Sequence, residues 1–317
     1  MDDRPPRAML QEVLRRSVMM AVVAVPLLAA SWRVSGGRPL GLFTFEIYLA
    51  VAGLLVLCEH WLPFERGWGS AVRGSKTDFA YVIVASAMDK LIFVVCVTTV
   101  ASVGRAMAEH FQIGLWPSGW NLGFQVAAAL LVADAATYLR HRLSHGSDFL
   151  WRFHRIHHSM TELYWIRSAY THPVEQFLIL CAIMLPISLL GAGDQVVAVV
   201  AFVFGLSGLV QHANVDARSS VLNYVFATPE VHRLHHRADD GSRANFSAFF
   251  VFMDHLFGTY RWPRRSEPPV PVGLPDETGF PTDFWSQLTI PFRRQAVTTA
   301  NETEPEADRP CAGEASR

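Results

Sequence analysis

Eight of the thirteen histidines in this chain lie in three short clusters. The clusters read HRLSH at residues 141–145, HRIHH at 154–158 and HRLHH at 232–236. Residues three or four apart share one face of a helix, about 5–6 Å apart at Cβ, so each cluster is expected to present its imidazoles as one patch. Neutral imidazole suits Zn, Cu, Fe and Ni, whereas carboxylate-rich sites suit Mg, Ca or Mn. The spacing predicts these metal ligands: His141, His145, His154, His157, His158, His232, His235 and His236.

The number of clustered histidines predicts two metal ions. A structural zinc site uses about four ligands and an octahedral ion about six, so eight imidazoles exceed the needs of one centre. The alternative is that these are ordinary surface or core histidines, which is the preferred interpretation of any isolated one. Because three clusters occur together and two of them repeat HxxHH, we favour the metal interpretation.

The composition indicates where these clusters lie. The chain is 51% hydrophobic and 17% charged, against about 25% charged residues in ordinary soluble domains. Several of its apolar stretches approach the roughly 17–25 residues needed to cross the hydrocarbon core of a bilayer. We therefore predict an all-α, multi-pass integral membrane protein. The apolar stretches are residues 17–31, 42–58, 79–103, 120–138, 174–191 and 194–210.

The Lys and Arg residues in the short loops predict the orientation. Heavily and lightly charged loops alternate, which places the N-terminus and the first two histidine clusters in the cytoplasm, at the inner membrane if the protein is bacterial. Stretches 174–191 and 194–210 are joined by a Gly-Ala-Gly-Asp turn and form a predicted hairpin that returns the third cluster to the same face. The basic, apolar N-terminal segment also resembles a secretory signal, but its charges fit a retained first helix better.

The chain divides into three predicted regions. Residues 1–119 form N-terminal membrane helices, residues 120–262 carry the histidine clusters, and residues 263–317 form a Pro-rich, polar and largely disordered tail. The four cysteines show no CxxC pairing, so they indicate neither a thiolate metal site nor a disulfide framework. No nucleic-acid motif is present, and a net charge of −1 gives no field that attracts an acidic polymer.

Residues 120–262 resemble the fatty acid hydroxylase and sterol desaturase superfamily of membrane enzymes. HRLSH, HRIHH and HRLHH match its HxxxH, HxxHH and HxxHH boxes in order, and AYTHPVEQ, VQHANV, ATPEVHRLHH and MDHLFGTY are similar to further stretches. Met253 departs from the usual Trp before Asp254. The resemblance implies a cytoplasmic-face helical cap in which histidines hold two irons. It also implies O2 as co-substrate and a lipid that is hydroxylated or desaturated.

The resemblance extends the site beyond the three boxes. His212 occupies the place of the histidine that completes the family's ligand set, whereas His172, which precedes Pro173, is equally suited to ligation, pocket lining or helix capping. Ligating histidines usually donate their second ring N–H to a carboxylate or carbonyl. Asp134, seven residues before His141, and Asn214 and Asp216, which follow His212, are candidates for that support.

Electrons are expected from an external donor. No GxGxxG turn, P-loop or cysteine set for an iron–sulfur cluster is apparent, so a ferredoxin or cytochrome b5 with its reductase is the predicted partner. A membrane zinc hydrolase is one alternative, although HExxH is lacking; a non-enzymatic metal-binding or transport protein is another. The boxes leave the lipid open among sterols, fatty acyl chains or sphingolipids, ether lipids and carotenoids.

Overall fold

The computed structural model describes residues 6–36, 41–69, 75–111, 114–264, 271–275 and 279–293. Over these ranges the chain is helical, and its β-structure is limited to three isolated bridges, so the predicted all-α class is confirmed. The longer helices are α1 (Pro6–Ser35), α2 (Gly41–Trp61), α3 (Lys76–Val95), α4 (Ala101–Phe111), α5 (Leu122–Gly146), α6 (Asp148–His158), α7 (Pro173–Leu189) and α8 (Asp194–His212). The shorter ones are α9 (Pro229–His235), α10 (Phe252–Phe257) and α11 (Phe284–Thr289).

Four helical spans are long and apolar enough to cross a membrane: Phe43–Trp61, Lys76–Phe111, Leu122–Gly146 and Asp194–His212. The second combines α3, a π-helical turn at Cys96–Val100 and α4. α7 is equally apolar but has only 17 residues, and α1 is not among the four spans although residues 17–31 were predicted to be a membrane stretch. The described chain therefore contains fewer full-length spans than its six apolar stretches suggest.

Side-chain caps fix where the helices near the histidines begin. Ser147 caps α6 by accepting from Leu150 N, so α6 starts two residues after α5 ends and the chain turns sharply between the first two histidine boxes. Thr228 caps α9 in the same way, and Pro229 follows at its first position. All three boxes lie at the C-terminal ends of their helices, α5, α6 and α9.

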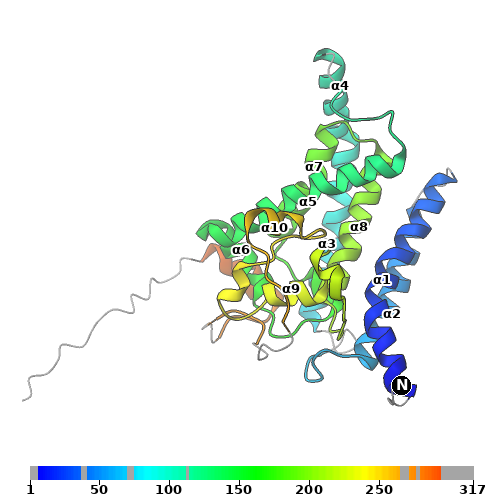
Figure 1. The fold of residues 1–317 in the computed structure, drawn as a ribbon. Helices are drawn as coiled ribbons and strands as arrows, with labels where there is room; N and C mark the ends of the chain where they lie inside the picture. The colour runs from blue at the N-terminus through cyan, green and yellow to red at the C-terminus, as the bar shows by residue number, and fades with distance from the viewer. Residues whose placement is uncertain are drawn as a thin grey trace, which may run out of the picture.

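The predicted hairpin is confirmed as α7 and α8. Gly191 has φ +92° in the connecting turn, a conformation that glycine adopts without strain. α8 is the most buried of the long helices, and α2 approaches it closely at Gly205, where a Cβ would overlap the Tyr48 hydroxyl. Figure 1 shows α3, α7 and α8 in the centre of the molecule, with α1 and α2 along one side.

Part of the predicted disordered tail is folded. Within residues 263–317, the segment 279–293 contains α11 and packs on α3, where the Tyr81 hydroxyl donates to Gln287 at 3.0 Å. Phe284 and Ile290 pack on the small core around Tyr81. This folding follows from the apolar residues of FWSQLTIPF, which bury surface that the surrounding polar sequence cannot. Residues 265–270, 276–278 and 294–317 lie outside the described residues.

Candidate metal centre

Nine histidines converge in two adjacent groups. In each group, the potential ligand atoms all lie within 4.8 Å of one another. The five-histidine group consists of His141, His145, His154, His158 and His235, and the four-histidine group of His157, His212, His232 and His236. The two groups touch, since the rings of His158 and His236 stack at 4.7 Å. These are the eight histidines of the boxes together with His212.

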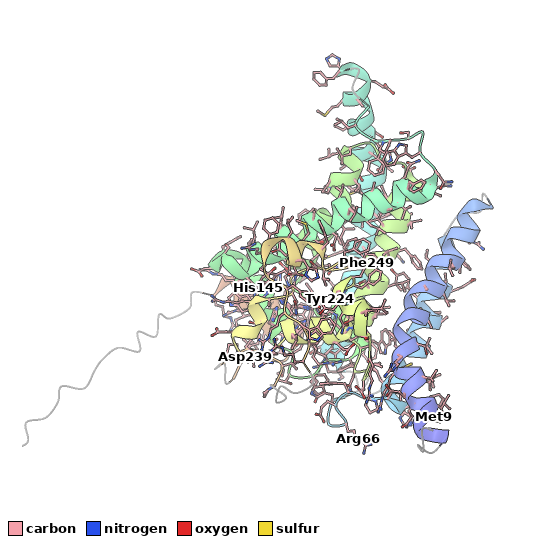
Figure 2. The ribbon with its side chains drawn as sticks, in the orientation of Figure 1. Met9, Arg66, His145, Tyr224, Asp239 and Phe249 are labelled. Atoms are coloured by element: carbon pink, nitrogen blue, oxygen red, sulfur yellow. The ribbon has the colours of Figure 1, made fainter. Side chains whose placement is uncertain are left out.

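Four helices supply the nine rings. His141 and His145 lie in the last turns of α5, and the second box lies at the end of α6. His212 is the last residue of α8, while α9 and its C-terminal cap carry the third box. In Figure 2, His145 lies in the body of the molecule beneath α5, away from the α1–α2 pair. The returning hairpin thus brings His212 and the third box to the first two boxes, as the sequence predicted.

Each HxxHH box is divided between the two groups, which corrects the expectation of one patch per cluster. His154 and His158 belong to the five-histidine group, but His157 belongs to the other. The third box is divided in the opposite sense, since His235 alone joins the five-histidine group. A helix turns about 100° per residue, so adjacent histidines diverge while residues four apart stay aligned. The two adjacent histidines of each HxxHH box therefore supply ligands to different groups.

Hydrogen bonds fix the tautomers of five rings. His141 Nδ1 donates to Phe246 O at 2.7 Å, and His235 Nδ1 donates to Ala244 O at 2.9 Å. His157 Nδ1 and His212 Nδ1 donate to the carbonyls of Tyr170 and Gly208, while His154 Nδ1 donates to Glu175 Oε1. Because these partners only accept, each Nε2 carries a lone pair.

The Nε2 lone pairs face one another. His141 Nε2 lies 3.1 Å from His154 Nε2 in one group, and His157 Nε2 lies 3.2 Å from His212 Nε2 in the other. A bridging proton would require an imidazolium, yet burial lowers the pKa of His154 and His157 well below the usual range. Two facing lone pairs repel unless a cation lies between them, so both groups fit a metal ion.

The Nε2 atom of His235 also indicates a metal site. This atom is buried and has no hydrogen-bond partner among the described residues. Burial lowers the pKa of His235 to about 4, so the ring is neutral at pH 7 and its lone pair is free for a metal. Eight of the nine rings are buried, and His145 is the partly exposed one. The donor set is all imidazole, which matches Zn, Cu, Fe or Ni and does not suit Mg or Ca.

Glu175 is the acidic partner that sequence reasoning missed. It is fully buried in the first turn of α7, and its Oε1 accepts from His154 Nδ1 at 2.9 Å. Arg140 of α5 forms an ion pair with the same oxygen. The sequence AYTHPVEQ contains this acid three residues after His172, but the spacing does not predict which histidine ring it contacts.

The other predicted site residues lie at the edge of the centre. His172 belongs to neither group, because its Nδ1 caps α7 by accepting from Val174 N and its Nε2 donates to Leu288 O. Asp134 accepts from Phe249 N, three residues beyond the carbonyl that holds His141. Asn214 exchanges hydrogen bonds with Glu65, and Asp216 pairs with Arg15 at 2.9 Å.

The fold and the site together define a helical membrane protein with a histidine-rich centre that could hold two metal ions. A family model described as fatty acid hydroxylase matches residues 126–259, a range that contains all nine histidines. The chain is 31% identical over 257 residues to the ornithine lipid hydroxylase OlsE of Rhizobium tropici, covering 78% of this chain and 75% of that protein. The chain belongs to the fatty acid hydroxylase and sterol desaturase superfamily.

Further relatives act on other lipids, according to their names. An alkylglycerol monooxygenase of Caenorhabditis elegans is 28% identical over 174 residues, which are 53% of this chain and 34% of that protein. Sphinganine C4-monooxygenase 1 of Arabidopsis thaliana is 32% identical over 144 residues, which are 44% of this chain and 55% of that protein. The chain thus spans about a third and about half of these two relatives. No solved structure matches the chain.

Proposed function

We propose that this protein is a di-iron, O2-dependent lipid hydroxylase or desaturase whose nine grouped histidines are the iron ligands. The observation that carries the proposal is the pair of facing Nε2 lone pairs, one in each histidine group, held at 3.1 Å and 3.2 Å. A buried arrangement of this kind is stable only around a cation. Two such arrangements in one chain call for two metal ions.

The number and spacing of the Nε2 atoms favour metals that take more than four ligands. At a metal–nitrogen distance of about 2.1 Å, two ligands at right angles are about 3.0 Å apart, and two tetrahedral ligands about 3.4 Å apart. Neighbouring Nε2 atoms in the two groups are 3.0–3.2 Å apart. The five-histidine group also has one ligand more than a tetrahedral ion accepts. These features support six-coordinate metals, and the superfamily supports iron among them.

The two irons, when bound, would supply the reduced metal that activates O2 for attack on an unactivated C–H bond. The protein's own residues hold the imidazoles in fixed tautomers through Glu175 and the surrounding carbonyls. They also shield the centre from water, since eight of the nine rings are buried. His145 is the partly exposed ring, and Trp151 lies beside it at 5.1 Å.

The substrate that we propose is a polar membrane lipid of the ornithine lipid type. The support is the similarity to ornithine lipid hydroxylase, which extends over 78% of this chain and so includes helices outside the histidine boxes. We further propose that the centre lies at the cytoplasmic face. A ferredoxin or cytochrome b5 with its reductase would deliver the two electrons that, with two protons, reduce the second oxygen atom to water during a hydroxylation.

The test is oxidation of a defined lipid by the reconstituted protein. Purified protein in bilayer discs containing ornithine lipid, supplied with iron, a ferredoxin and its reductase, is incubated with 18O2. The proposal expects a lipid heavier by one 18O atom if the protein hydroxylates, or lighter by two hydrogens if it desaturates. The assay is repeated with cytochrome b5 and its reductase as the electron donor. If iron is bound and the lipid is unchanged with both donors, the proposed activity is contradicted.

A further inference from the structure

A cavity of about 460 Å³ opens at the end of α2, beyond the histidine groups. Its walls come from the last turns of α2, the following loop and one residue that follows α8. The volume lies within the range of small-molecule sites, roughly 300–1,000 Å³. Figure 2 shows Arg66, one of its lining residues, near the same end of the molecule as Met9 of α1. None of the nine grouped histidines lines this cavity.

Glu59 gives the cavity its chemistry. The residue is only 5% exposed, and its Oε1 accepts from Trp165 N at 2.8 Å and from Asn214 N at 3.0 Å. Its Oε2 has no hydrogen-bond partner among the described residues. A buried carboxylate oxygen without a partner is unfavourable, and a charged donor is the partner that offsets this best. Glu59 therefore suits a ligand that brings a cation.

The remaining walls favour the same kind of ligand. Trp61 and Trp68 line the cavity, and indole faces attract ammonium groups. Glu65 adds a second carboxylate, whereas Arg66 offers a cation for an anionic part of the ligand. Trp61 ends a candidate membrane span and is 63% exposed, as expected for an interfacial tryptophan. The cavity thus lies at the level of lipid headgroups.

Asn214 places the cavity close to the metal centre along the chain. This residue lines the cavity and lies two positions after His212 of the four-histidine group. Its side-chain Oδ1 accepts from Glu65 N at 3.0 Å, and its backbone N–H donates to Glu59 Oε1 at 3.0 Å. A headgroup held by Glu59 would therefore lie against Asn214, which follows His212 in the chain.

We infer that this cavity binds the headgroup of a lipid that carries a primary ammonium group, with Glu59 as its principal partner. The inference rests on the proposed function, since it names the headgroup class of the same substrate. Glu59 and Glu65 bind the ammonium between the two tryptophans, and Arg66 binds an anionic group of the same headgroup. The proposal explains why a membrane helix ends in a buried acid beside a cavity.

The test is a competition between two lipids for the full-length, iron-loaded protein in detergent. Native mass spectrometry compares binding of ornithine lipid with binding of the same lipid after N-acetylation, which removes the charge. We expect wild-type protein to prefer the amine by about ten- to a hundredfold, the range of a charge-assisted hydrogen bond. Glu59→Gln, whose side-chain oxygen still accepts from both amides, should reduce that preference to near parity.

The matched control is Glu46→Gln, an exposed acid at the other end of α2. It should keep the wild-type preference. If Glu59→Gln does not fold, Glu65→Gln on the exposed side of the cavity provides the second variant and should lower the preference several-fold. Equal binding of the two lipids by the wild type, or full preference in Glu59→Gln, would overturn the headgroup site. Equally tight binding of free ornithine would overturn the assignment to a lipid.

Iron content and lipid oxidation are measured on the same samples. An amine preference without lipid oxidation would leave the headgroup site standing and contradict the proposed function. Lipid oxidation without an amine preference would contradict the headgroup site and leave the proposed function standing.

Discussion

The two histidine groups are built from the same motif and differ in what supports them. In the five-histidine group, His154 donates to the buried Glu175, which Arg140 also contacts. In the four-histidine group, the identified acceptors of His157 and His212 are backbone carbonyls. A carboxylate makes a metal-bound imidazole more basic than a carbonyl does. The two metals are therefore expected to differ, with the five-histidine metal held more tightly than the four-histidine metal.

Removing one ligand from each group gives the largest expected effect and tests this difference directly. His232→Ala leaves three ligands in its group, so we expect loss of one iron per chain and more than about a hundredfold loss of lipid oxidation. His145→Ala leaves four ligands, so most of the iron should remain. Metal analysis of both variants and the 18O2 assay measure these outcomes.

His255→Ala is the control, because His255 belongs to neither group and donates to Tyr224 O. It should keep the iron and activity of the wild type. If His232→Ala kept both irons, or if His145→Ala lost more metal than His232→Ala, the comparison between the groups would be wrong.

Replacing Glu175 should affect the five-histidine group alone. Glu175→Gln keeps the size of the side chain but removes the charge that His154 and Arg140 share. Loss of such a supporting partner typically costs 10–100-fold in metal affinity or activity. Competition with a graded series of chelators should show one weakened iron and one unchanged iron. Equal weakening of both would show that the groups do not bind independently.

His172 should give the smallest effect. His172→Ala removes the cap of α7, which costs about 1 kcal/mol of unfolding free energy. The iron content should stay the same, because His172 belongs to neither histidine group. His172→Asn, which can also cap a helix, should recover most of the stability. A loss of iron in His172→Ala with normal thermal unfolding would make His172 a ligand after all.

Much of this site was readable from the sequence, for identifiable reasons. The histidine spacing is a local pattern that predicts the eight box histidines, and the two apolar stretches with their Gly-Ala-Gly-Asp turn predict the hairpin. His212 was expected from the family resemblance. The division of each HxxHH box also follows from helical geometry, but it depends on which partners stand on either side. That information comes from the packing of α5, α6, α8 and α9 and is absent from the local pattern.

The supporting contacts were the hardest to predict. Four of the acceptors that orient the rings are backbone carbonyls, which carry no residue signature. Asp134 was expected to support a ligand because it shares a helix face with His141, yet it binds the backbone of Phe249. Glu175, from the next α-helix along the chain, contacts His154 instead. The folding of residues 279–293 was also hard to predict, because it depends on packing against α3.

The metal content of the purified protein tests the account most directly. Mass spectrometric metal analysis, with protein quantified by amino-acid analysis, should find two iron atoms per chain in the wild type. The His232→Ala variant should contain one. A single zinc per chain, or a variable fraction of readily exchanged metal, would contradict the two-centre arrangement on which the proposed function depends.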